Sequence, residues 1–118
     1  MRILLAEDDA SIAGLVVELL SGEGYDVTVS SSAGQTLRLV MAEGWNLCIS
    51  DTFGQTHAQP DPGDISYFQA LAARVPVIVA TARPWAAQLA AADLGVAAIF
   101  LKPFDLNQFL EAVQRLSA

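Results

Sequence analysis

The sequence predicts an α/β protein with a doubly wound (βα)5 sandwich, in which a five-stranded parallel sheet carries helices on both faces. Short apolar runs alternate with helical patterns five times along the 118 residues. The runs at 3–6 and 77–80 are apolar at successive positions, which is typical of strands covered on both faces. Strands separated by helices are parallel, with right-handed crossovers. We therefore expect one domain spanning residues 1–118.

The first two strand–helix units occupy the first third of the chain. Residues 2–6 form an apolar strand, and the following helical pattern begins at Ser11 and ends at Gly22. Its apolar residues recur at helical spacing and predict one buried face: Ile12, Leu15, Val16, Leu19 and Leu20. Residues 25–30 alternate between apolar and polar, as a half-exposed edge strand does, and precede a helix at 33–44.

The third unit begins with a buried strand at 45–50. This strand contains the only cysteine, Cys48, which we expect to be a small buried hydrophobic residue. A long Gly-, Pro- and Asp-rich loop follows at 52–63. A helix is predicted at 64–75, with Asp64 as its N-cap.

The last two units complete the pattern. Residues 76–80 form a β-branched strand, and the next helix runs from Pro84 to Leu94 and ends at Gly95. Residues 97–101 form the fifth strand. Asp105 is the predicted N-cap of the last helix, whose apolar face comprises Leu106, Phe109, Leu110 and Val113.

Composition limits the possible partners and compartment. The net charge of −7 disfavours direct binding to nucleic acid, and it suits a basic protein partner or a metal cation. No apolar run is long enough to cross a membrane, and no signal peptide is visible. Together with the single cysteine, these features indicate the cytoplasm. The oligomeric state cannot be read from the sequence.

Four of the predicted strands end in side chains that carry charge or a hydroxyl group. Glu7 and Asp8 follow the first strand, Asp51 the third, Thr81 the fourth and Lys102 the fifth. The carboxyl ends of parallel strands share one edge of the sheet, so we expect these groups to meet there. Asp9 has a simpler explanation, because an acid before a helix caps its N-terminus.

The chemistry of this set points to phosphoryl transfer assisted by a metal ion. Three carboxylates repel one another, and a hard dication such as Mg²⁺ relieves that repulsion. A carboxylate can also attack phosphorus and form an aspartyl phosphate. The developing charge on the phosphoryl group is then neutralised by a metal ion and a lysine, and the hydroxyl of Thr81 can donate to a phosphoryl oxygen.

In order along the chain, "ILLAEDDA", Asp51 after "LCIS", "VIVATA" and "FLKPF" resemble the motifs of receiver domains of two-component response regulators. The resemblance covers the whole chain and implies the CheY-like, flavodoxin-like strand order 2-1-3-4-5. It also implies that a sensor histidine kinase or a histidine phosphotransfer protein donates a phosphoryl group. A downstream protein would then recognise the face formed by the fourth helix, fifth strand and fifth helix.

The resemblance also implies a role for each matched residue. Asp51 is the phosphoacceptor, Thr81 the switch hydroxyl, and Lys102 the cation that pairs with the phosphoryl group or the acids. In the Mg²⁺ site of Glu7, Asp8, Asp51 and the backbone carbonyl of Phe53, Asp8 is the direct ligand and Glu7 holds metal-bound water. By the same analogy the Lys102–Pro103 peptide bond is cis. Such a domain catalyses its own phosphorylation and dephosphorylation and is not otherwise an enzyme.

Three positions depart from the family pattern. The loop after Asp51 is longer and less regular than usual, which affects access to the acceptor. Ile99 occupies a position that is often aromatic, so switching by rotation of an aromatic ring is not expected. Phe53 and Arg83 stand where the family tunes dephosphorylation, and because Phe53 cannot hydrogen-bond an attacking water, we expect slow phosphate loss.

Other functions remain as alternatives. A degenerate receiver would act as an interaction module without phosphorylation, which the loop and Ile99 favour and the intact acidic set opposes. An aspartyl-nucleophile phosphotransferase commonly needs a second acid two residues after the nucleophile, where this chain has Phe53. A flavin binder would need a phosphate-binding loop after the first strand, where three acids stand. His57 is expected at the surface, and Trp85 and Leu89 in packing.

Overall fold

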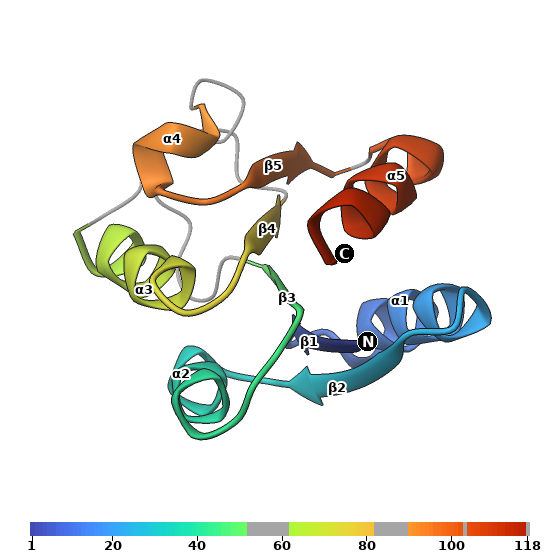
Figure 1. Ribbon diagram of the computed structural model, residues 1–118, viewed down its shortest axis with the longest axis horizontal. Coiled ribbons are helices and arrows are strands. Elements are labelled where there is room, and N and C mark those ends of the chain that lie inside the picture. The colour runs from blue at the N-terminus through green and yellow to red at the C-terminus, as the bar shows by residue number, and fades with distance from the viewer. Residues whose placement is uncertain (52–61, 82–89, 103, 118) are drawn as a thin grey trace.

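The computed structural model describes residues 1–51, 62–81, 90–102 and 104–117. Within these residues the strands form one parallel sheet in the order β2-β1-β3-β4-β5 (Figure 1). The strands are β1 (Arg2–Ala6), β2 (Asp26–Ser30), β3 (Leu47–Ser50), β4 (Val77–Thr81) and β5 (Ala98–Leu101). The predicted fold and strand order are confirmed, and the alternating strand β2 lies at an edge.

Helices cover both faces of the sheet, as Figure 1 shows. They are α1 (Ala10–Gly22), α2 (Ala33–Ala42), α3 (Pro62–Ala72), α4 (Ala91–Leu94) and α5 (Leu106–Ser117). Helices α1 and α5 lie on one face, and α2, α3 and α4 on the other. None of the helices in the described ranges has the length and apolar character that a membrane crossing requires.

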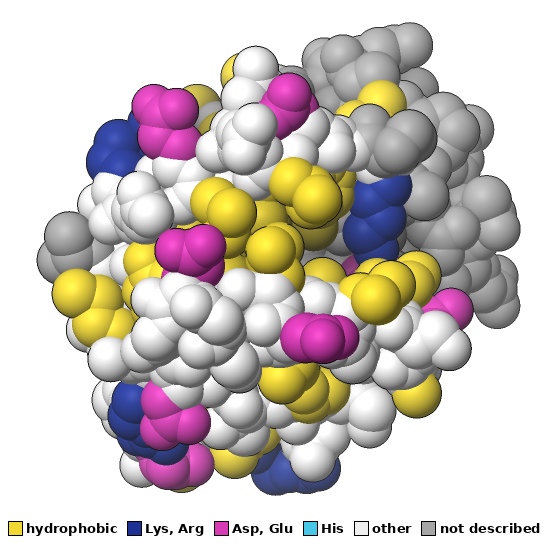
Figure 2. Space-filling view, turned by 90° about the vertical axis from the view of Figure 1, so that its right-hand side faces the viewer, with side chains coloured by type: hydrophobic (Ala, Val, Ile, Leu, Met, Phe, Trp, Pro, Cys, Tyr) yellow, Lys and Arg dark blue, Asp and Glu magenta, His cyan; other side chains and the backbone are white. Residues whose placement is uncertain are grey.

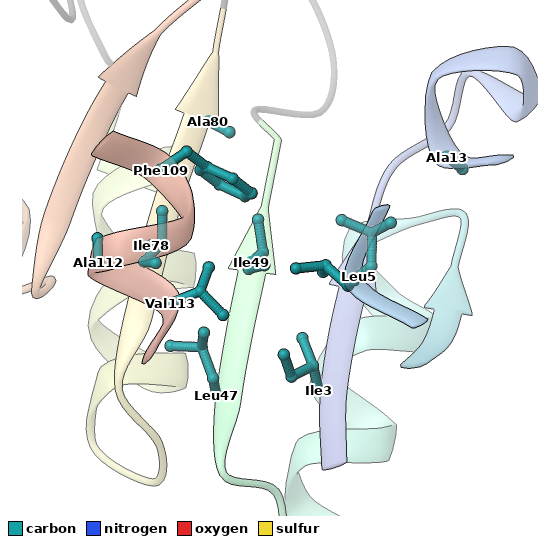
Figure 3. Close-up of a cluster of buried hydrophobic side chains, with 11 residues drawn as sticks. Ile3, Leu5, Ala13, Leu47, Ile49, Ile78, Ala80, Phe109, Ala112 and Val113 are labelled. Atoms are coloured by element: carbon teal, nitrogen blue, oxygen red, sulfur yellow. The ribbon is translucent and has the colours of Figure 1, made fainter. Parts of the chain in front are cut away.

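Each face of the sheet has its own hydrophobic core. Under α1 and α5, inward-facing residues of the strands such as Ile3, Ile49 and Ile78 meet Phe109 and Val113 of α5 (Figure 3). These side chains are at most 2% exposed, so the strands are buried on this face. Because adjacent residues of a strand point to opposite faces, the intervening residues supply the second core.

The second core lies under α2, α3 and α4. Leu4, Cys48 and Val79 of the strands pack there against Phe68 of α3 and Leu94 of α4. Burial raises the pKa of the Cys48 thiol to about 12, so this thiol stays protonated at neutral pH. The expectation that Cys48 is a buried hydrophobic residue is confirmed.

The buried face of α1 differs from the predicted one. Leu15 is 68% exposed and Ile12 is 36% exposed. The residues that face the core are Ala13, Val16, Val17 and Leu20, which also recur at helical spacing. The prediction is confirmed for Val16 and Leu20 and was wrong for Ile12 and Leu15, because it counted only large side chains and left out Ala13, a small residue that is buried against the sheet.

Two details of α3 and α5 also differ from expectation. Helix α3 begins at Pro62, so Asp64 lies within its first turn and is not its N-cap, and the helix ends at Ala72. Asp105 caps α5 as predicted, because its Oδ1 accepts from the backbone N–H groups of Asn107 at 2.8 Å and Gln108 at 3.1 Å. Leu106, which was predicted on the apolar face, stands in the first turn and is 56% exposed, so that part of the prediction was wrong.

Helix α4 ends at Gly95 as predicted, but it begins only at Ala91. The predicted helix from Pro84 does not continue through Ala90, whose backbone is extended. Gly95 adopts a left-handed backbone conformation with φ of 73°. An alanine there would keep that conformation only under strain. We expect Gly95→Ala to lower the free energy of unfolding by about 1 kcal/mol. Gly34→Ala, in the open first turn of α2, should leave stability unchanged or raise it slightly. Urea unfolding of both variants checks this, and equal effects would contradict it.

Candidate functional site

The polar residues predicted to converge do lie along one edge of the sheet, just past the carboxyl ends of the strands. The backbone ladder continues into them. The N–H of Asp51 donates to the carbonyl of Ala6 at 2.9 Å, and the N–H of Lys102 donates to the carbonyl of Thr81 at 2.8 Å. The N–H of Glu7 donates to the carbonyl of Ser30 at 3.0 Å. The rigid sheet therefore sets where these side chains begin.

Three carboxylates gather at this edge. One carboxylate oxygen each from Glu7, Asp8 and Asp51 lies within 4.8 Å of the other two. Only the side chain of Glu7 is buried, at 5% exposure, and that of Asp51 is 17% exposed. Oxygen ligands at this spacing suit a hard dication, which would relieve their repulsion. These residues fit a magnesium ion by their donor chemistry.

Lys102 supplies the positive charge of the site. Its Nζ lies 3.1 Å from Oε2 of Glu7, to which it donates a hydrogen bond, and 3.7 Å from Oδ2 of Asp51. The lysine side chain is 22% exposed, so the ion pair with Glu7 is shielded from solvent on one side. One ammonium group, at the carboxyl end of β5, thus contacts two of the three acids.

Thr81 lies at the end of its strand and Asp9 caps a helix, as the sequence predicted. Thr81 is the last residue of β4 and is fully buried at the same edge. Asp9 caps α1, because its Oδ1 accepts from the N–H groups of Ser11 at 2.9 Å and Ile12 at 3.2 Å. Its own N–H donates to Oε1 of Glu7 at 3.2 Å. The capping explanation for Asp9 is confirmed.

An apolar cavity of about 290 Å³ opens beside the charged groups, between α1 and α5. Leu5, Ile49 and Ala80 line it on the sheet side, and Ile12 and Leu106 line it on the helix side. Figure 2 shows this face, where hydrophobic side chains surround a hollow. Apolar walls next to the acids reduce their contact with water, so charge–charge interactions there are stronger than at an open surface.

The pKa of the Glu7 carboxyl is raised, chiefly because burial disfavours its charged form and then because of the nearby charge of Asp51. The hydrogen bond from Lys102, the N–H of Asp9 and the charge of Lys102 act in the opposite direction but do not cancel the effect. A site without a cation therefore makes Glu7 harder to ionise than a free glutamate, and a bound cation would favour the ionised form.

This shift predicts a pH dependence of stability. Because the pKa of Glu7 in the folded state lies above its ordinary value of 4.5, the folded protein holds that proton more tightly than the unfolded chain. Without divalent metal, the contribution of Glu7 to the free energy of unfolding is present below pH 4.5 and is lost as the pH rises through the folded-state pKa. Urea unfolding at several pH values should show this loss, and Glu7→Gln should remove it.

The matched control is Glu111→Gln, which changes the same group on the exposed face of α5 and should leave the pH profile unchanged. Saturating Mg²⁺ should also flatten the profile of the wild-type protein, since the metal stabilises the ionised form. A contribution of Glu7 that increases with pH in the absence of metal would contradict this explanation.

Several predictions fall on residues outside the described ranges. They concern the carbonyl of Phe53, the Lys102–Pro103 peptide bond, Arg83, and the positions of His57, Trp85 and Leu89. Ile99 is described: it is half-buried and packs against the core under α2, α3 and α4. Sequence reasoning did not identify the hydroxyl groups of Ser50 and Tyr67, which bond to each other next to Asp51. A serine at the end of the otherwise apolar β3 was the available signal.

Comparisons with solved structures find the same fold in other proteins. The receiver domain of HemR from Leptospira biflexa is 25% identical, with a TM-score of 0.77 over 99% of this chain and 94% of that one. A CheY-like response regulator receiver domain protein from Methanospirillum hungatei is 25% identical, with a TM-score of 0.79 over 98% and 92%. The response regulator TrrA from Thermotoga maritima, solved in complex with Mg²⁺–BeF, is 20% identical, with a TM-score of 0.79 over 98% and 97%.

No protein-family model and no curated protein sequence matches the chain. The structural matches nevertheless extend over nearly its whole length, and they are to response regulator receiver domains. The protein thus has the CheY-like receiver fold. The resemblance that the ordered sequence motifs predicted is confirmed.

Proposed function

We propose that this chain is a phosphoacceptor domain of a two-component system and that Asp51 receives the phosphoryl group. The observation that carries the proposal is the position of Asp51. Its carboxylate lies within 4.8 Å of those of Glu7 and Asp8, and its Oδ2 lies 3.7 Å from Nζ of Lys102. This arrangement presents a nucleophile, a set of metal ligands and a cation at one point.

The transfer step is a displacement at phosphorus. An oxygen of the Asp51 carboxylate attacks the phosphorus atom of a phosphohistidine, and the new O–P bond replaces the N–P bond. The electron pair of the broken bond stays on the imidazole nitrogen of the donor. Lys102 stands where it offsets the negative charge of the phosphoryl oxygens, and the hydroxyl of Thr81 is proposed to donate to one of them.

Glu7, Asp8 and Asp51 would hold Mg²⁺, with the carbonyl of Phe53 as the fourth protein ligand proposed by family analogy. The bound ion would supply positive charge that neutralises the phosphoryl oxygens. That TrrA, a protein of the same fold, was solved with Mg²⁺–BeF supports this assignment. The acidic surface, with a net charge of −7, suits a divalent cation and disfavours nucleic acid.

The proposed donor is a sensor histidine kinase or a histidine phosphotransfer protein in the cytoplasm. Residues 1–118 would act as one receiver domain that catalyses only its own phosphorylation and dephosphorylation. Phosphorylation would shift an equilibrium between two conformations and alter the α4–β5–α5 face, which a downstream protein would read. The single cysteine supports a cytoplasmic location. The net charge of −7 suits a partner with basic patches.

Mass spectrometry of the intact protein tests the proposal. Incubation with acetyl phosphate and millimolar Mg²⁺ should add one phosphoryl group, and EDTA should prevent the addition. The added mass should map to the peptide that contains Asp51 and should be lost on treatment with hydroxylamine, as an acyl phosphate is. A protein that stays unmodified would instead support an interaction module that works without phosphorylation.

A further inference from the structure

Several hydroxyl groups lie on the α2/α3 side of the sheet, and one of them belongs to Ser50, the residue before the phosphoacceptor. Oγ of Ser50 donates to the backbone carbonyl of Asp51 at 2.8 Å and lies 3.0 Å from the hydroxyl oxygen of Tyr67. On the same side, Oγ1 of Thr36 donates to the backbone carbonyl of Ser32 at 2.7 Å and lies 2.6 Å from Oγ of Ser30.

The donors near Asp51 can be assigned from the number of protons. A serine hydroxyl has one hydrogen to donate, and Ser50 uses it on the carbonyl of Asp51. Tyr67 must therefore be the donor in its bond with Ser50. Burial raises the pKa of Tyr67 to about 12, so the phenol keeps that proton at physiological pH. Tyr67 therefore donates to Ser50, and Ser50 donates to the backbone carbonyl of Asp51.

Packing alone does not account for this hydroxyl group. The ring of Tyr67 packs against Phe68, with centroids 5.1 Å apart, and a phenylalanine would make the same contact. Ser50 and Thr36 are fully buried in an otherwise apolar layer, where an alanine and a valine would fill similar space. A buried polar group destabilises the fold unless it is hydrogen-bonded. A fully hydrogen-bonded network, in turn, holds its members in one geometry.

We propose that Tyr67 is a positioning residue for Asp51, acting through Ser50. At the other end of the same residue, the N–H of Asp51 donates to the carbonyl of Ala6 at 2.9 Å. The backbone of the acceptor is thus fixed at its N–H by β1 and at its carbonyl by the bond from Ser50. These two restraints aim the carboxylate at Glu7, Asp8 and Lys102. The inference rests on the proposed function of Asp51.

The test uses Tyr67→Phe, which keeps the ring and removes the hydroxyl. Loss of one hydrogen bond that orders the acceptor should slow phosphorylation by acetyl phosphate about fivefold and raise the Kd for Mg²⁺ by a similar factor. The matched control is Tyr25→Phe, which removes a phenol hydroxyl that accepts from Ser117 on the opposite side of the sheet. The control should change neither quantity.

A double-mutant cycle shows whether Tyr67 acts through Ser50. Ser50→Ala should slow phosphorylation like Tyr67→Phe, and the double variant should be no slower than the worse single variant. Additive effects would overturn the inference, as would a Tyr67→Phe variant whose rate and Mg²⁺ affinity match those of Tyr25→Phe. A general loss of stability is excluded by measuring both variants well below their unfolding temperatures.

Hydrogen exchange keeps the test independent of phosphorylation. In Tyr67→Phe the Asp51 N–H should exchange about fivefold faster, since Ser50, which holds the carbonyl of the same residue, has lost its bond with Tyr67. The N–H of Cys48, which lies in β3 and donates to the carbonyl of Pro76 just before the neighbouring strand β4, should be unchanged. If the wild-type protein accepts no phosphoryl group, the proposed function fails, but faster exchange at Asp51 alone still supports the positioning role. Unchanged exchange at Asp51 overturns it.

Discussion

Asp51→Asn should abolish phosphorylation by acetyl phosphate and by any phosphohistidine donor. The amide that replaces the carboxylate is a poor nucleophile toward phosphorus, and no other acid of the cluster occupies its place at the end of β3. Glu7 is engaged by Lys102 at 3.1 Å, and Asp8 lies on the neighbouring strand end. Intact-mass spectrometry after incubation with donor and Mg²⁺ should show the unmodified mass only.

The same substitution should weaken Mg²⁺ binding and stabilise the metal-free protein. One of three ligating carboxylates is lost, so the Kd should rise about tenfold, equivalent to roughly 1.4 kcal/mol. Without metal, the removal of one charge relieves repulsion with Glu7 and Asp8, and the free energy of unfolding should increase. Calorimetric titration measures the loss of Mg²⁺ affinity. Urea unfolding measures the gain in stability of the metal-free protein.

Asp9→Asn is the matched control for this prediction. It makes the same change of charge only two residues from Glu7, but asparagine caps a helix as well as aspartate does. Phosphorylation and Mg²⁺ affinity should stay close to those of the wild type. If Asp9→Asn matched Asp51→Asn in either measurement, general loss of negative charge would explain the results, and Asp51 would have no special role.

The convergence of Glu7, Asp51 and Lys102 could be predicted because it depends only on topology. Once the alternating pattern shows that the strands are parallel, their carboxyl ends must share an edge, whatever the packing. The capping roles of Asp9 and Asp105 could also be predicted, since a cap is decided by neighbours within three residues. These features need no knowledge of how one side chain packs against another.

Features that depend on packing could not be predicted in the same way. The buried face of α1 is decided by how closely the helix approaches the sheet. The small Ala13 is buried there, whereas the larger Leu15 is exposed. The contact between Tyr67 and Ser50 joins residues 17 positions apart on different elements. This contact depends on the rotation of α3 about its axis. An apolar pattern does not specify that rotation closely enough to place two hydroxyl groups at hydrogen-bond distance.

Lys102→Met should slow phosphorylation about 100-fold, the size expected for losing one group that stabilises developing negative charge in a shielded site. The thioether keeps the length of the side chain but cannot pair with the phosphoryl oxygens. Mg²⁺ affinity should stay the same or increase, because the lysine charge next to Glu7 and Asp51 no longer opposes the cation. Rate and metal affinity would therefore change independently, which a merely unfolded or distorted site does not produce.

Stability provides the third measurement for Lys102. Without metal, Lys102→Met leaves Oε2 of the buried Glu7 carboxylate without the lysine donor, so the free energy of unfolding should fall by about 1–3 kcal/mol. Lys102→Arg keeps the charge with a different donor geometry and should recover part of the rate. Arg38→Met, the same loss of charge on the exposed side of α2, should change none of the three quantities. A Lys102→Met variant that is phosphorylated at the wild-type rate would remove Lys102 from the proposed site, and the positive charge beside Asp51 would then serve only to pair with Glu7.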